Sequence, residues 1–241
     1  MNVYGFNAVL EALRAGRVRR LKIGPRSDRR VDEALALAKQ HGVPVERVDA
    51  QTLERLARGG VHQGIAAELA PMPDYSVQQL VEAAAPDAPL LVVLDGVEDP
   101  HNVGAIVRTV DAAGAHGIIR QARHAASLDG ATAKASAGAV AFVRIATVVN
   151  IARAIDELKA AGVWTVGFAG EAGEMYDDVD YTVPTAIVVG SEGEGLRRLT
   201  RERCDRLVKI PMAGAVDSLN VSVAAGVALF EAARQRRAKA R

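Results

Sequence analysis

Cysteine is almost absent from this 241-residue chain, which contains only Cys204. A single cysteine excludes a disulfide framework within the chain and leaves no second thiolate for a zinc site. The five histidines show no metal-ligand spacing, so we expect no bound metal. Aromatic residues make up only 4% of the chain, so the hydrophobic core must consist mainly of alanine, valine, leucine and isoleucine.

Targeting and membrane-spanning segments are also missing. The N-terminal stretch MNVYGFNAVLEAL lacks the basic and then apolar order of a signal peptide. No apolar run reaches the roughly 20 residues of a transmembrane helix. We therefore expect a cytoplasmic protein without a membrane partner.

The common nucleotide-binding fingerprints are missing as well. No G-x-G-x-x-G motif joins a predicted strand to a helix, and no glycine is followed by lysine and serine or threonine. The loop SEGEGL has glycines, but their spacing does not match a dinucleotide fingerprint. Nicotinamide and nucleoside-triphosphate chemistry are therefore not predicted.

Positive charge is unevenly distributed along the chain. The formal net charge is only +1, yet residues 1–70 contain 12 Lys and Arg residues against 8 Asp and Glu residues. The charged residues after Glu231 are all basic: Arg234, Arg236, Arg237, Lys239 and Arg241. A solvated surface is the ordinary explanation for either run taken alone.

The first 70 residues alternate between helical and strand patterns, which predicts a small α/β/α domain. Helices are predicted over 2–16, 31–42 and 50–60, and strands over 17–24, 43–49 and 62–70. The segment His62-Gln63-Gly64 fits a polar turn better than a site where the backbone approaches a substrate. Clustered prolines over residues 71–88 then predict a linker.

Residues 89–241 predict a second α/β domain with a mostly parallel sheet. LLVVL is a continuous apolar run, typical of a strand buried on both faces, and strands alternate with helices from there on. The polar stretch DGVEDPHNVG and the acidic stretch EAGEMYDDVD are predicted loops. Near the end, the strand TAIVVG opens into SEGEGL, and SLNVSVAAGVALFEAARQRR predicts a helix. Ligands of parallel sheets bind at the carboxyl ends of the strands, so we expect a binding site there.

Three segments of this domain resemble the sequence motifs of the SpoU/TrmH class (SPOUT superfamily) of RNA ribose 2′-O-methyltransferases. They are LDGVEDPHNVGAIVRTVDAAG, VVGSEGEGL and IPMAGAVDSLNVSVAAGVALFEA. YGFNAVLEAL and VHQGI are similar to the substrate-binding domain of the same proteins. The resemblance covers nearly the whole chain, and within the class it points to the bacterial enzymes that methylate a guanosine of 23S rRNA.

The resemblance implies a fold and an activity. The expected fold has a deep trefoil knot in the C-terminal domain and an L30e-like N-terminal domain that binds the RNA, in a homodimer. The expected cofactor is S-adenosylmethionine without a metal, and the expected substrate is 23S rRNA, free or in a precursor particle. Methylation of tRNA and a non-catalytic RNA-binding role remain as alternatives.

The same motifs imply the site residues. The cofactor-binding candidates are Thr165, Gly167, Gly190, Ile210, Ser218 and Leu219. The catalytic candidates are Asn102, Arg108, Glu192, Ser218 and Asn220. An arginine stays protonated in proteins, so we expect Arg108 to stabilise the developing alkoxide rather than act as a base. Glu192 would accept the proton or orient the cofactor and the ribose.

Ordinary structural roles compete with some of these assignments. Ser218 fits a helix N-cap, Asn102 fits a turn residue after Asp99-Pro100, and Arg108 fits a surface position of a helix. In one segment the chain departs from the family pattern, because Ala141 and Arg144 stand where relatives often carry an acid and a proline. This departure bears on local structure and RNA contacts rather than on the chemistry.

RNA affinity comes largely from Lys and Arg side chains that neutralise phosphates. The segment between residues 17 and 30 is rich in arginine. We therefore expect Arg19, Arg20 and Arg26 to contact RNA.

Overall fold

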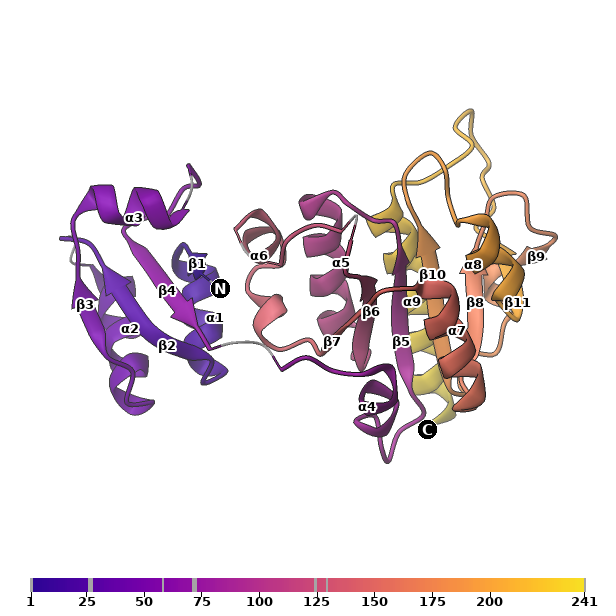
Figure 1. Ribbon diagram of the computed structural model, residues 1–241, viewed down its shortest axis with the longest axis horizontal. Coiled ribbons are helices and arrows are strands. Elements are labelled where there is room, and N and C mark those ends of the chain that lie inside the picture. The colour runs from indigo at the N-terminus through magenta and orange to yellow at the C-terminus, as the bar shows by residue number, and fades with distance from the viewer. Residues whose placement is uncertain are drawn as a thin grey trace. The chain divides into compact units, whose positions relative to one another are not determined.

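The chain folds into two compact units. The computed structural model describes residues 2–25, 28–57, 59–70, 73–123, 125–128 and 130–240, so the predicted RNA contact Arg26 lies outside the described residues. One unit comprises Met1–Pro73, Val103–Arg108 and Ser127–Phe142, and the other comprises Asp74–Asn102, Thr109–Ala126 and Val143–Arg241 (Figure 1).

The first unit contains a four-stranded sheet in the order β1-β4-β2-β3. The strands are β1 (Asn2–Tyr4), β2 (Val18–Ile23), β3 (Val45–Arg47) and β4 (Ile65–Leu69). The β1–β4 and β4–β2 pairs are antiparallel, whereas β2 and β3 are parallel. Three helices accompany the sheet: α1 (Phe6–Arg14), α2 (Arg29–Gln40) and α3 (Ala50–Ala57). The predicted alternation of helices and strands is confirmed.

The helix predicted over residues 2–16 is wrong at its start. Residues 2–4 form β1, in which Val3 pairs with Ala67 of β4. Gly5 then adopts a φ of 83°, which separates the strand from α1. Pairing with a distant strand overrides the local helical pattern here, and short segments are the ones most open to such an override.

Residues 127–142 of this unit include a helical segment that packs against α1. It contains α6 (Ala131–Ala135) and a short 3₁₀ helix (Ala139–Ala141). The break lies at Ala137 and Gly138, both of which have a positive φ. A Cβ on Gly138 would lie 3.2 Å from the backbone of Ala8, so only a glycine allows this close approach.

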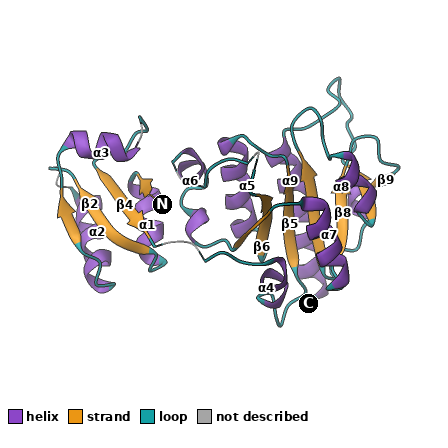
Figure 2. Ribbon diagram, viewed as in Figure 1, coloured by secondary structure: helices purple, strands orange, loops and turns teal. Residues whose placement is uncertain are grey.

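The second unit is built on a seven-stranded sheet in the order β7-β6-β5-β10-β8-β11-β9 (Figure 2). Every neighbouring pair is parallel, which confirms the predicted parallel sheet. The strands are β5 (Leu90–Asp95), β6 (Gly117–Gln121), β7 (Ile145–Val148), β8 (Trp164–Phe168), β9 (Glu174–Met175), β10 (Thr185–Gly190) and β11 (Arg206–Lys209). All residues of β5 and β10 are buried, as expected of strands covered on both faces.

Helices cover the sheet. Apolar residues of α4 (Val77–Glu82) and α7 (Ile151–Ala160) share one core cluster with β5, β6, β7 and β10. Helix α9 (Val221–Lys239) packs on β10 and approaches α5 (Pro100–Ala112), with Gly226 beside Thr109. Among the described residues, no helix has both the length and the apolar character that a bilayer span requires.

Several segments differ from the sequence-based expectation. Helix α5 begins at Pro100 with Asp99 as its N-cap, so Asn102 lies in a helix and not in a turn. Helix α8 (Arg198–Arg203) was not predicted, and the predicted acidic loop over 171–180 contains β9. Helix α4 lies within the predicted linker. It begins with a capping box at Ser76 and buries Val77 and Leu80. Residues 74–88 therefore pack as part of the second unit.

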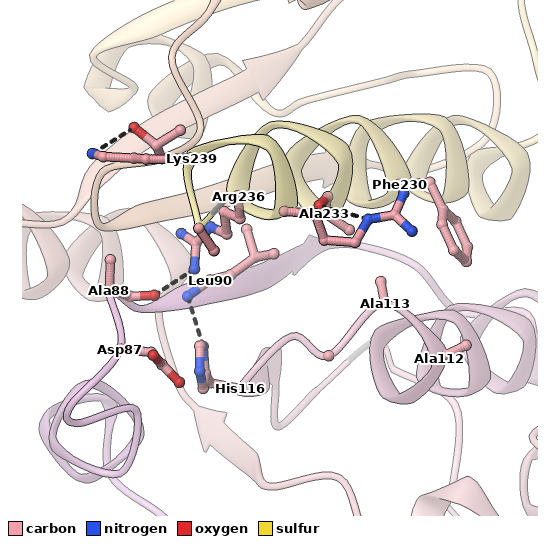
Figure 3. Close-up of a pocket in the computed structure, with 14 residues that line it drawn as sticks. Asp87, Ala88, Leu90, Ala112, Ala113, His116, Phe230, Ala233, Arg236 and Lys239 are labelled. Carbon is pink, nitrogen blue, oxygen red and sulfur yellow. Dashed lines mark hydrogen bonds between the residues drawn. The ribbon is translucent and has the colours of Figure 1, made fainter.

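The C-terminal helix is anchored by one guanidinium. Arg236 donates hydrogen bonds to the carbonyl oxygens of Tyr181 (2.9 Å), Pro89 (2.9 Å) and Val183 (3.0 Å), and a further one to Ala88. These carbonyls precede β10 and β5. The side chain lines a cavity of about 500 Å³ beside the first residue of β5, opposite His116, which hydrogen-bonds to Leu90 (Figure 3). Arg236 thus joins α9 to the amino ends of the two central strands.

Replacing Arg236 with methionine should lower the free energy of unfolding by about 2 kcal/mol or more, because several half-buried carbonyls lose their donor. Arg237→Met is the matched control, since exposed Arg237 bonds only a carbonyl of its own helix, and it should change stability by less than about 0.5 kcal/mol. Urea unfolding followed by circular dichroism measures both. Equal stability of the two variants would contradict the anchoring role.

Candidate functional site

The carboxyl ends of β8, β10 and β11 open into one cavity of about 790 Å³. It is lined by four segments of the second unit, residues 168–171, 189–196, 208–210 and 217–221. Small-molecule sites have volumes in this range, and they occur at this edge of parallel sheets. The predicted site at the end of the chain therefore exists as one cavity.

The loop after β10 closes tightly on itself. Ser191 and Gly195 exchange two backbone hydrogen bonds, of 3.1 and 3.0 Å. A Cβ on Gly190 would lie 2.0 Å from the carbonyl carbon of Gly195, so no other residue fits at this strand end. The backbone that approaches Gly190 this closely is that of its own loop.

Three of the catalytic candidates form one hydrogen-bonded network. Asn102 Nδ2 donates to Glu192 Oε1 at 2.9 Å, and Asn220 Nδ2 donates to the same oxygen at 2.6 Å. Asn220 Nδ2 also approaches Asn102 Oδ1 at 3.0 Å. These side chains come from the start of α5, the loop after β10 and the N-cap of α9. Among the described residues, Glu192 Oε2 has no hydrogen-bond partner, so it remains available to a ligand.

The segment before α9 contributes three candidates to the cavity wall: Ser218, Leu219 and Asn220. The N-cap role considered for Ser218 is wrong, because Asn220 Oδ1 caps the helix by accepting from Ser222 N at 2.9 Å. Ser218 is exposed, and its hydroxyl donates to Asp217 at 3.2 Å. Ile210 also lines the cavity.

Thr165 and Gly167 do not line the cavity. Thr165 is fully buried, and its backbone N and Oγ1 donate to Asp205 Oδ2 at 2.9 and 2.7 Å. A Cβ on Gly167 would meet the side chains of Leu196, Leu207 and Cys204, at 3.0 Å or less. Burial raises the pKa of the Cys204 thiol to about 12, so this thiol is not a nucleophile at neutral pH.

Arg108 is exposed on α5, and the structure brings it neither into the cavity lining nor into the Glu192 network.

The sequence analysis missed a polar contact between Asp95 and Arg197 at the end of β5. Asp95, at the end of β5, is 1% exposed and accepts a hydrogen bond from Arg197 N at 2.9 Å. The acidic residue at the end of the apolar run LLVVLD is the sequence feature that could have indicated this contact. This contact ties the end of the β10 loop to the neighbouring strand.

Among the described residues, no group of three or more His, Cys, Asp or Glu side chains could hold a metal ion. The fold and the cavity define an α/β protein with a cavity of small-molecule size at the carboxyl ends of a parallel sheet.

Comparisons with known proteins narrow this class. The profile of the SpoU rRNA Methylase family matches residues 89–230, and that of the RNA 2′-O ribose methyltransferase substrate-binding family matches residues 2–75. The 23S rRNA (guanosine-2′-O-)-methyltransferase RlmB of Pseudomonas putida is 44% identical, over 98% of this chain and 97% of its own length. The chain therefore belongs to the SpoU methylase family.

Solved structures of SpoU-type methyltransferases are similar to the structure of this chain. The SpoU methyltransferase AviRb of Streptomyces viridochromogenes, in complex with AdoMet, has a TM-score of 0.83 and 28% identity, and the match covers 99% of this chain and 91% of AviRb. The AdoMet-bound rRNA methyltransferase of Sinorhizobium meliloti has a TM-score of 0.78 and 29% identity, covering 97% and 86%. The TrmH/SpoU tRNA modifying enzyme of A. aeolicus is 35% identical with a TM-score of 0.59, covering 68% of this chain and 84% of its own.

Replacing Gly190 with alanine should lower the free energy of unfolding by about 1–3 kcal/mol, because the added methyl overlaps the Gly195 backbone. Gly170→Ala is the matched control, since it lies on the wall of the same cavity and a Cβ there meets no atom within 4 Å. Thermal and urea unfolding of both variants measure the effect. The account of the loop fails if Gly190→Ala is as stable as the control.

Proposed function

We propose that this protein transfers a methyl group from S-adenosylmethionine to the ribose 2′-hydroxyl of a guanosine in 23S rRNA. One observation carries the proposal. The segments VVGSEGEGL and IPMAGAVDSLNVSVAAGVALFEA, which resemble two of the SpoU/TrmH motifs, line a single cavity, and Asn102 from the remaining motif joins Glu192 and Asn220 in one network.

The cavity suits the proposed cofactor. Apolar side chains of Ile210, Leu219 and Leu196 offer a surface for the adenine, and the strand-end backbone offers donors and acceptors for its polar edge. When bound, S-adenosylmethionine supplies an electrophilic methyl group. The trefoil knot that the resemblance implies for this region stays a prediction, and so do the cofactor roles of Thr165 and Gly167.

The polar network supplies the groups that the reaction needs. A ribose hydroxyl is a weak nucleophile that loses its proton during the transfer, so a nearby acceptor favours the reaction. Glu192 Oε2 is the proposed acceptor, with Oε1 held by the two amides. Asn102 and Asn220 orient Glu192. Arg108 acts on the RNA phosphate and the developing alkoxide, and Ser218 contacts the substrate at the rim.

We assign RNA binding to residues 1–70 and catalysis to residues 89–241, with residues 74–88 packed as part of the catalytic unit. Arg19 is exposed and lies at a register shift in β2. Arg20 is also exposed, 3.9 Å from Glu46 and paired in the sheet with Glu68. Arg19 therefore offers the less compensated charge to RNA phosphates. Arg26 completes the proposed set.

Ribosomal RNA is favoured over tRNA by the extent of the matches. The 23S rRNA enzyme of P. putida matches 98% of this chain, whereas the tRNA enzyme of A. aeolicus matches 68%. A non-catalytic RNA-binding role is disfavoured by the intact network around Glu192. Because its proposed substrate is ribosomal RNA, we place the protein in the cytoplasm.

We also propose a homodimer formed through α9. Val221 and Leu229 are buried within the chain, but Val223 and Phe230 are each 51% exposed. A second copy would cover this apolar face. Analytical sedimentation at micromolar protein concentration measures the oligomeric state, and a monomer would contradict this proposal.

The activity is tested by incubating the protein with methyl-labelled S-adenosylmethionine and a chelator, and with either 23S rRNA or tRNA. We expect label in 23S rRNA alone, at one guanosine whose 3′ linkage resists alkaline cleavage. Label confined to tRNA would support the alternative substrate. Absence of label from both RNAs would remove the enzymatic proposal.

Arg108→Ala should reduce methyl transfer on the order of a hundredfold, because the lost charge acts on the RNA in the transition state. Its affinity for S-adenosylmethionine, measured by calorimetry, should stay unchanged. Arg153→Ala is the control, because Arg153 is also an exposed helical arginine and pairs with Glu157. Turnover near that of the control would show that Arg108 is not catalytic.

A further inference from the structure

Two segments of the first unit come together in a way that the proposed chemistry does not use. The segments 4–7 and 60–64 lie side by side, joined by a hydrogen bond from Phe6 N to Gln63 Oε1 at 3.0 Å. A Cβ on Gly60 would collide with the Tyr4 ring, and Gly5 donates its N–H to Ile65 O. The two segments therefore form one rigid surface.

Gln63 occupies this surface at a conformational cost. Its φ is 55°, in the left-handed region that favours glycine, so the backbone of Gln63 is strained. The side chain is needed here because Oε1 caps Phe6 N. Gln63 is exposed, and its Nε2 has no hydrogen bond within the described residues. That amide group points its donors to solvent.

The neighbouring side chains of Asn7 and His62 also use their acceptor atoms within the protein. Arg30 lies 5.1 Å from the centre of the Phe6 ring and donates to Asn7 Oδ1 at 2.7 Å. This bond uses the acceptor of Asn7 and leaves its Nδ2 without a partner in the described part of the chain. His62 Nδ1 accepts from Gly64 N at 3.0 Å, so the proton of the neutral ring is on Nε2.

These side chains form a patch of hydrogen-bond donors, because the acceptor atoms of Asn7, His62 and Gln63 already accept hydrogen bonds from the protein. We call Asn7, Arg30, His62 and Gln63 the donor patch. Within the described residues, no carboxylate pairs with any of these four side chains. The outer face of β2 is different, because Arg20 and Lys22 both lie within 4 Å of Glu46. The donor patch therefore suits a ligand that is rich in acceptors.

We propose that the donor patch binds an unpaired nucleotide of the RNA substrate, through acceptor atoms on its base edge and its phosphate. Amide side chains and guanidinium groups are the side chains that read base edges, and specific RNA recognition targets unpaired nucleotides. The patch adds recognition to the non-specific attraction of Arg19 and Arg20. This inference rests on the proposed function, because it takes 23S rRNA as the substrate.

Two isosteric variants test the patch without removing its internal bonds. Gln63→Glu keeps an oxygen for Phe6 N and removes the Nε2 donors, and Asn7→Asp keeps the oxygen for Arg30 and removes the Nδ2 donors. Each should raise the KM for a 23S rRNA transcript about tenfold or more, because a base contact is lost and a carboxylate faces RNA acceptors. The kcat and the affinity for S-adenosylmethionine should stay at wild-type values.

Gln40→Glu controls for the added charge. Gln40 is exposed at the other end of α2 from Arg30, roughly 15 Å along the helix axis. It should leave the KM for RNA within about twofold of wild type. Circular dichroism confirms that all three variants fold.

The outcomes separate this inference from the proposed function. A wild-type KM in both isosteric variants, or an equal rise in Gln40→Glu, would overturn the donor patch while the activity stands. A wild-type protein that methylates no 23S rRNA would overturn the proposed function. A rise in KM confined to Gln63→Glu and Asn7→Asp would support the inference, since a purely structural role is preserved in both.

Discussion

The tight return of the chain after β10 is the constraint on which the site depends. Gly190 packs directly against the Gly195 backbone, so the loop between them has almost no freedom. This closure holds Glu192 where it meets two amides that are distant in sequence, Asn102 at a separation of 90 residues and Asn220 at a separation of 28. A parallel sheet brings such strand ends to one edge, and the loop turns that edge into a cavity.

The last helix links the site to the stability of the sheet. At its start, Asn220 caps α9 with Oδ1 and binds Glu192 with Nδ2. Near its end, Arg236 binds carbonyls that precede β5 and β10. The same helix is therefore fixed at both edges of the sheet, beside the two central strands, all of whose residues are buried. The groups of the candidate site thus gain their positions from groups that stabilise the fold.

Much of the architecture could be predicted from sequence, because the buried strands read as continuous apolar runs separated by helical periods. The order of the strands could not, since the pairing of β5 with β10 joins segments 95 residues apart. Residues 2–4 were misassigned because pairing with β4 decides their conformation. In the site, Gly190, Glu192, Ile210, Leu219 and Asn220 line the cavity as expected from their motifs. Thr165 was assigned through the family resemblance and lies outside the cavity lining, and its bond to Asp205 is a contact that no local pattern reveals.

A crystal structure of the protein with S-adenosylmethionine tests the central claim most directly. The account predicts the cofactor in the cavity at the carboxyl ends of β8, β10 and β11, with its adenine against Ile210 and Leu219 and its methyl group facing the Glu192 carboxylate. A cofactor bound elsewhere on the chain, or a Glu192 network that lies away from the methyl group, would contradict it.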